Sequence, residues 1–174
     1  WWLHALRGAL LFIGITLWSC ALGKVQMSMA TVINFTLPFY VLIMARYVLG
    51  EKISTARALA TVTGFVGAVI TMNPFGQSFV LESLLLVFAS LSFASLDIVN
   101  KKFVSSEPFW AMILYSSLFT SLIAAPVAFY QWQPVSMNDI VVIMALGLGA
   151  NLLLFCLLRA FTLADASALS PLRY

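Results

Sequence analysis

The chain has 174 residues, of which 63% are hydrophobic and 9% are charged, and its formal net charge is +3. A soluble domain carries about 25% charged residues, so a soluble fold of this length could not cover its surface with polar side chains. The Lys and Arg residues are scattered between apolar blocks and form no stripe, which argues against a nucleic-acid partner.

Apolar blocks follow one another along the whole chain, separated by short connections rich in Gly, Pro and charged residues. A membrane-spanning helix needs about 20 mostly apolar residues. We therefore predict an all-α, polytopic transmembrane helical bundle whose partner is the lipid bilayer. The predicted spans are residues 6–22, 30–49, 58–72, 81–100, 109–130 and 140–158, with a further one beginning near Ala166. Pro38 and Pro126 lie inside spans, where each is expected to bend its helix.

The distribution of Lys and Arg predicts how these spans are oriented, because cytoplasmic loops retain positive charge. One side of the predicted bundle receives Arg7, Arg46, Lys52, Arg57, Lys101, Lys102 and Arg159. The other side receives Lys24, together with the acidic Glu82 and Asp139. The first span is therefore expected to run from the cytoplasm outward.

A weak internal repeat predicts two related units of opposite orientation. Residues 21–30 and residues 160–169 share an apolar rhythm, and the offset between them covers five helices, an odd number. Inverted repeats of this kind are typical of secondary carriers. We place the end of the first repeat at about 1–76 and the start of the second at about 77–174. The chain begins at Trp1 and stops at Tyr174 within an apolar segment, so we expect it to be a fragment of a longer protein.

The residue inventory argues against an enzyme. The single histidine is His4, so neither a zinc H-E-x-x-H site nor a Ser-His relay can be assembled. Cys20 and Cys156 lie in apolar blocks, where thiols pack as small hydrophobic groups. No P-loop motif is present. We expect no catalytic residue, no metal and no cofactor.

Asp97 is the first candidate for substrate binding. An acidic group inside a span costs about 2.5–3.5 kcal/mol at the helix centre and usually faces a cavity or a partner. Lys101 lies four residues later, in the favourable order for a helical ion pair, so pairing and ligand contact both remain open. Phe93 lies one turn before Asp97 on the same face, and aromatic rings attract cations. Trp18 is a second aromatic candidate, although membrane Trp residues more often anchor at the lipid interface.

Further candidates come from the predicted repeat. It aligns Arg173 with Asn34, which suggests a shared cavity near the symmetry centre. A guanidinium at this depth could bind a substrate carboxylate or extend to the membrane surface. The complete set of predicted substrate-binding residues is Asp97, Phe93, Arg173, Tyr174, Trp18, Asn34 and Asn100.

Three stretches resemble a known family. They are Arg7-Gly8-Ala9-Leu10-Leu11-Phe12-Ile13-Gly14-Ile15-Thr16-Leu17-Trp18, residues 96–104 (LDIVNKKFV) and residues 164–174 (ADASALSPLRY). With them the whole chain resembles the EamA-type branch of the drug/metabolite transporter superfamily, and most of all the S-adenosylmethionine uptake transporters of intracellular bacteria. The resemblance implies ten helices in two inverted five-helix repeats, of which this chain supplies helices three to eight and the start of the ninth.

The resemblance also implies a function. It predicts a secondary transporter that imports S-adenosylmethionine across the bacterial inner (cytoplasmic) membrane by alternating access, with exchange for S-adenosylhomocysteine as a further expectation. The sulfonium cation suits Asp97 and aromatic faces, and the carboxylate suits Arg173. Two alternatives stay open: an exporter of amino acids or other small metabolites on the same scaffold, and a non-transporting or channel-like membrane protein.

Overall fold

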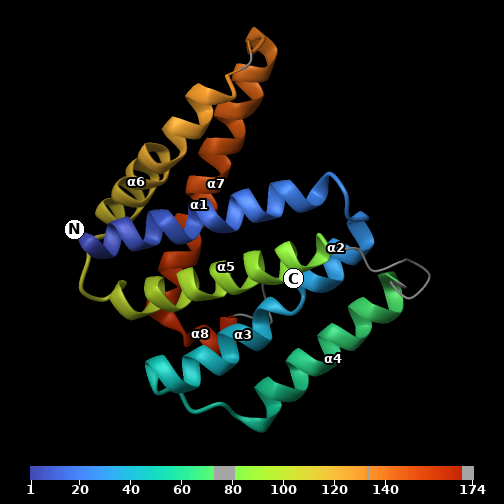
Figure 1. The fold of residues 1–174 in the computed structure, drawn as a ribbon. Helices are drawn as coiled ribbons and strands as arrows, with labels where there is room; N and C mark the ends of the chain where they lie inside the picture. Colours follow the sequence, from blue (N-terminus) through green and yellow to red (C-terminus); the bar gives the residue numbers. More distant parts are fainter. Residues whose placement is uncertain (73–80, 133, 170–174) are drawn as a thin grey trace.

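The computed structural model describes residues 1–72, 81–132 and 134–169. Every regular element in these ranges is helical, which confirms the all-α prediction (Figure 1). The elements are α1 (Trp2–Leu22), α2 (Met27–Asn34), α3 (Leu37–Met44), the π-helical turn η1 (Ala45–Leu49), α4 (Thr55–Met72), α5 (Ser83–Phe103), α6 (Phe109–Tyr130), α7 (Met137–Leu163) and α8 (Ala166–Leu169).

The helices match the predicted spans one for one, with α2, α3 and η1 together forming the second. Within the described residues, five helical segments are long and apolar enough to cross a membrane. They are Trp2–Leu22, Met27–Leu49, Ser83–Phe103, Phe109–Tyr130 and Met137–Leu163, and the apolar helix Thr55–Ile70 is shorter. The chain is therefore a multi-pass membrane protein.

The largest boundary difference occurs in α7, which is longer at both ends than the predicted span 140–158. Its start is fixed by a capping box, in which Ser136 Oγ accepts a hydrogen bond from Asp139 N at 3.2 Å and Asp139 Oδ2 accepts one from Ser136 N at 3.3 Å. These bonds satisfy amide groups that the first helical turn leaves unpaired. Asp139, which the predicted spans leave in a connection, therefore lies in the first turn of α7, and Ser136 is the N-cap of that helix.

The second span bends where Pro38 occupies the first turn of α3. Proline has no amide hydrogen, so Pro38 cannot donate to the carbonyl of Asn34, where α2 ends. At this break, Thr36 N and Thr36 Oγ1 both donate to Ile33 O, at 2.9 Å and 2.6 Å. The span ends at Gly50, whose φ of 70° is left-handed and favours glycine. The predicted bend at Pro38 is thus confirmed. At Pro126, by contrast, α6 continues as one helix to Tyr130.

Helices α1 and α5 lie side by side at the centre of the bundle (Figure 1). Helices α2 and α3 pack on α5, and α4 packs on α2. Helices α6 and α7 form a hairpin that rises away from α1 in Figure 1. Gly8 permits the contact between α1 and α6, because a Cβ added there would lie 2.6 Å from Phe119 Cβ and 2.9 Å from the amide nitrogen of Thr120.

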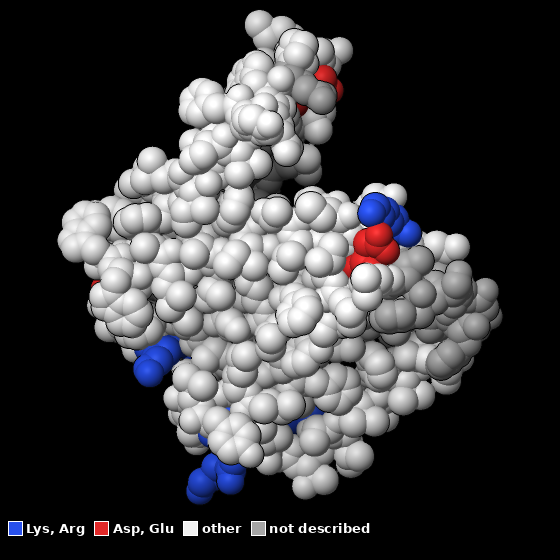
Figure 2. Space-filling view, viewed as in Figure 1, with Lys and Arg blue, Asp and Glu red and all other residues white. Residues whose placement is uncertain are grey.

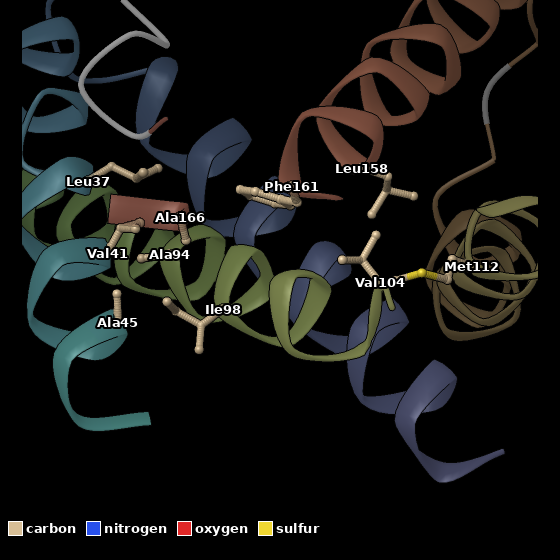
Figure 3. Close-up of a cluster of buried hydrophobic side chains, with 10 residues drawn as sticks. All are labelled: Leu37, Val41, Ala45, Ala94, Ile98, Val104, Met112, Leu158, Phe161 and Ala166. Atoms are coloured by element: carbon tan, nitrogen blue, oxygen red, sulfur yellow. The ribbon is translucent and has the colours of Figure 1, made fainter. Parts of the chain in front are cut away.

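A cluster of buried apolar side chains joins α5 to the helices that follow it and to α3 (Figure 3). In lipid the surroundings are as apolar as the side chains, so close packing and dispersion stabilise this cluster more than transfer out of water does. Its members are Leu37, Val41, Ala45, Ala94, Ile98, Val104, Met112, Leu158, Phe161 and Ala166.

Contacts at the two ends of the bundle agree with the predicted charge asymmetry. At one end, Lys24 Nζ and Glu82 Oε1 form a salt bridge of 2.8 Å. Figure 2 shows that most of this face of the molecule is white and that its few charged side chains lie near the edges. The hydrogen bond between Lys24 and Glu82 raises the pKa of Lys24 and lowers the pKa of Glu82. Arg7 contacts Asn100 at the opposite end, where α1 begins and α5 approaches its end.

At this second end, charged residues hold the α7–α8 junction, defined here as residues 164–167, which are the two connecting residues and the first two residues of α8. Glu51 Oε1 accepts a hydrogen bond from Ala166 N at 2.9 Å, and Glu51 Oε2 accepts from Ser167 N at 3.0 Å and from Ser167 Oγ. Arg57 Nη1 donates to Ser167 Oγ at 2.7 Å and forms a 2.9 Å salt bridge with Asp165 Oδ2. The start of α4 is thereby tied to the end of α7.

Candidate functional site

Two adjoining cavities lie beside α1, α5 and α7, the first extending to α2, α3 and α8 and the second to α6. The first, the aromatic cavity, has a volume of about 680 Å³ and includes Trp18, Asn34 and Phe93 in its lining. The second, the polar cavity, has a volume of about 520 Å³. Both are lined by Ile15, Phe93, Leu153 and Leu157, so these side chains form the wall between them.

Polar side chains from four helices converge on the polar cavity. A cavity with mostly apolar walls and a few convergent polar groups is the usual form of a small-molecule site. So many polar side chains around one cavity are unusual for a chain in which 9% of residues are charged. The polar members of the lining are Arg7, Asp97, Asn100, Ser116, Ser117, Thr120, Ser121 and Asn151.

Asp97 and Asn100 are presented by one face of α5. They are three residues apart, so their side chains lie one turn from each other on the helix. Asp97 is 5% exposed and Asn100 is 1% exposed. Asn100 Oδ1 accepts a hydrogen bond of 2.7 Å from Nε of Arg7, which is itself 2% exposed. Helices α1 and α5 therefore meet through a buried polar contact at the edge of the cavity.

Phe93 separates the two cavities and lies directly against α1. A Cβ added at Gly14 would come within 2.6 Å of Phe93 Cε1 and 2.9 Å of Phe93 Cδ1. The absence of a side chain at Gly14 is therefore what lets the ring pack against the helix backbone. Trp18 is one turn further along α1 and is half-buried against a second apolar cluster that includes Ala21 and Leu86. It lines a cavity, whereas the sequence favoured an interfacial position for it.

Lys101, the predicted helical partner of Asp97, forms hydrogen bonds with the end of α7. Its Nζ donates to Phe161 O and Ala164 O, both at 2.7 Å. Carbonyls at a helix C-terminus are otherwise unpaired and carry partial negative charge, which explains why an ammonium group lies here. The half-buried Lys101 is thus held in place by the carbonyl groups at the end of α7.

The structure brings together five of the predicted site residues. Trp18, Asn34 and Phe93 line the aromatic cavity, and Phe93, Asp97 and Asn100 line the polar cavity. The remaining two, Arg173 and Tyr174, lie outside the described residues. No group of three or more His, Cys, Asp and Glu side chains that could hold a metal ion occurs within the described ranges.

Arg7 lines the polar cavity, and the set of site residues predicted from the sequence does not include it. Its place inside the first predicted span distinguishes it from Lys52, which follows the second span. The adjacent Gly8, which marks a close helix approach, was the second available signal. Together they indicated a guanidinium directed into the bundle.

Comparison with known proteins adds named relatives. The chain is 42% identical over 171 residues to the S-adenosylmethionine uptake transporter of Rickettsia conorii, a match that covers 98% of this chain and 58% of that protein. It is also 42% identical to the transporter of the same name from Rickettsia bellii, covering 98% of this chain and 59% of the relative. It is 33% identical over 170 residues to the riboflavin transporter of Vibrio cholerae, covering 97% of this chain and 57% of that protein.

The chain thus spans 58% of the length of the first of these relatives. No solved structure matches it. Residues 1–73 match the model of the EamA-like transporter family, and the named relatives, which are transporters, extend the match over nearly the whole chain. The chain belongs to the EamA-like transporter family.

Proposed function

We propose that the protein is a secondary transporter, and not an enzyme, that imports S-adenosylmethionine across the bacterial inner membrane by alternating access, in exchange for S-adenosylhomocysteine. The observation that carries this proposal is the 42% identity, over 98% of the chain, to a protein named for S-adenosylmethionine uptake. The cavities are compatible with such a cargo because they combine aromatic faces with charged and polar groups.

The proposed binding site uses the residues predicted from the sequence. Asp97 and the Phe93 ring would attract the sulfonium cation, because carboxylates and aromatic faces both stabilise positive charge in a dry site. Trp18 and Asn34 in the aromatic cavity would contact the adenosine moiety, the ring by stacking and the amide by hydrogen bonds. Arg173 and Tyr174, aligned with the first repeat by sequence, complete the proposed set with Asn100.

The inverted repeat gives this site a place in the transport cycle. In the proposed division, residues of about 1–76 contribute α1 to α4 and residues of about 77–174 contribute α5 onward. Both cavities are lined from both units, which is where carriers with inverted repeats bind their substrates. Movement of one unit against the other would open the site to each side in turn.

Riboflavin is the competing cargo, because relatives at 33% identity or below are named riboflavin transporters. Riboflavin is uncharged at neutral pH. The polar cavity is lined by the ionisable Arg7 and Asp97, and Coulomb attraction acts between such groups and a charged ligand but not a neutral one. A ligand that carries both charges is therefore favoured.

Uptake by cells that express the full-length protein tests the proposal. We expect them to accumulate labelled S-adenosylmethionine, with competition by S-adenosylhomocysteine and not by riboflavin. We expect Asp97→Asn to lower uptake about tenfold or more at equal membrane abundance, since a lost charge interaction of this kind is large in a dry site. Asp139→Asn is the control, because this carboxylate lies at the exposed start of α7 and an amide retains its capping oxygen.

Saturable counterflow in proteoliposomes distinguishes a carrier from a channel-like protein. Preloading with unlabelled S-adenosylmethionine should accelerate entry of the label. Export without uptake would favour the metabolite exporter, and normal uptake by Asp97→Asn would remove this residue from the site.

A further inference from the structure

Arg7 is a buried cation to which the proposed substrate site assigns no ligand group. It lies in the second turn of α1, is 2% exposed, and lines the polar cavity. Arginine is rarely buried without an anion or several acceptors, because removal of its charge from water is costly. A guanidinium in this position therefore needs a negative charge or several hydrogen-bond acceptors close to it.

The protein supplies part of that compensation. Nε of Arg7 donates to Asn100 Oδ1. Within residues 1–72, 81–132 and 134–169, this is the one hydrogen bond that the Arg7 side chain makes. The negative charge of Glu107 stabilises the Arg7 cation from a distance. The two ion pairs of 4 Å or less among the described residues are Lys24–Glu82 and Arg57–Asp165, and neither involves Arg7. The Nη1 and Nη2 groups, four donors in a planar fork, thus remain for a ligand, and such a fork matches the two oxygens of a carboxylate.

A second polar group supports a ligand at this place. Ser116 lines the same cavity and is 2% exposed, and its Oγ has no hydrogen-bond partner among the described residues. Buried hydroxyls are nearly always paired, and a hydroxyl beside a cavity can donate to an oxygen of a ligand there.

The packing of α1 on α6 sets Ser116 and Arg7 at a similar level. His4 packs on Tyr115, with ring centroids 4.9 Å apart, and Gly8 contacts Phe119. These two contacts lie on either side of Arg7 along α1 and on either side of Ser116 along α6, so the two residues, which both line the polar cavity, lie at neighbouring levels of it.

We propose that Arg7, oriented by Asn100 and assisted by Ser116, binds the free carboxylate of an amino-acid zwitterion whose cationic part is bound near Asp97. This inference rests on the proposed function and deepens it, because it defines the cargo class as α-amino acids with an unblocked carboxylate. It places the carboxylate on a residue of α1, in a cavity that the described helices already form, and does not depend on Arg173.

The test compares ligands that differ only in the carboxylate. S-adenosylmethionine and its decarboxylated analogue share the sulfonium and the adenosine. Binding of each to the purified full-length protein is measured by the shift in thermal stability, and each is also used to inhibit counterflow in proteoliposomes. We expect the wild type to prefer the carboxylated ligand by about 10- to 100-fold, as for a bidentate charged hydrogen bond.

Substitutions assign that preference to residues. Arg7→Gln should abolish it, because affinity for the carboxylated ligand falls far more than affinity for the decarboxylated analogue. Asn100→Ala should reduce the preference. Ser116→Ala should lower it about threefold, and it removes a buried unpaired hydroxyl, so folding is not at risk. Arg46→Gln, at an exposed position on the same end of the bundle, should behave as the wild type.

The outcomes separate the two proposals. If the wild type binds with carboxylate preference but carries no S-adenosylmethionine, the proposed function fails and the carboxylate site stands. If the wild type shows no carboxylate preference, or if Arg7→Gln and Ser116→Ala both keep it, the carboxylate site is wrong while S-adenosylmethionine transport is unaffected.

Discussion

Replacement of Glu51 by Gln is expected to loosen the α7–α8 junction. The Glu51 carboxylate accepts hydrogen bonds from Ala166 N, Ser167 N and Ser167 Oγ. A glutamine keeps one oxygen, which can still accept from Ala166 N, but it turns an amide N–H₂ toward the donors of Ser167. Two charge-assisted bonds are lost, each with a value of about 1.5–3 kcal/mol when fully buried. Because Glu51 is only half-buried, we expect a total of about 2–4 kcal/mol.

That free energy predicts a measurable change in local opening. It corresponds to an increase of about 30- to 1,000-fold in the population of the open junction. Hydrogen exchange of the Ala166 and Ser167 amides in the full-length protein reports this population, since both amides donate to Glu51. Lys52→Gln, at the next and exposed position, is the control. If exchange in Glu51→Gln stays within about threefold of the wild type, the carboxylate does not hold the junction.

Three further predictions concern packing and charge. Gly14→Ala should displace the Phe93 ring and raise the KM for uptake about tenfold, measured at matched membrane abundance; an unchanged KM would show that the ring does not contact the cargo. Gly8→Ala should lower the thermal stability by about 1–3 kcal/mol, because α1 and α6 must move apart. The Lys24–Glu82 bridge should stabilise the fold fully between about the ordinary pKa of Glu82, 4.5, and that of Lys24, 10.5. The Glu82 contribution is present above its unfolded pKa and disappears as pH falls through the lowered folded value, and the Lys24 contribution disappears as pH rises through the raised folded value. A melting difference between wild type and Glu82→Gln that persisted below both carboxyl values would contradict this.

The number and order of the helices could be predicted from the sequence because each span is a long apolar run, and the membrane requires every backbone group in it to be bonded within a helix. The ends were harder to predict. At α7 the polar pair Ser136 and Asp139 resembles a loop in composition, but its side chains serve the helix as caps. Composition alone cannot distinguish these two uses of the same residues.

The site was predicted in part for a similar reason. Asp97 and Phe93 were identifiable because a carboxylate and an aromatic ring on one face of a span are unusual. Arg7 was not, since a basic residue near the start of a span normally extends to the membrane surface. Its burial depends on Asn100, which is 93 residues away in the chain, and on the glycine that brings α6 close. Such long-range contacts leave no local pattern.

The Phe93 ring bears on how a ligand would pass between the two cavities. It is one of the four side chains of the wall, and an aromatic side chain can rotate about two bonds, a motion faster than the movement of whole helices. Under the proposed function, a turn of this ring would widen the passage between the aromatic and polar cavities while α1 and α5 keep their contact. Loading of the cargo and reorientation of the carrier would then be two separate steps of the proposed cycle, and the residue at position 93 would act on the first.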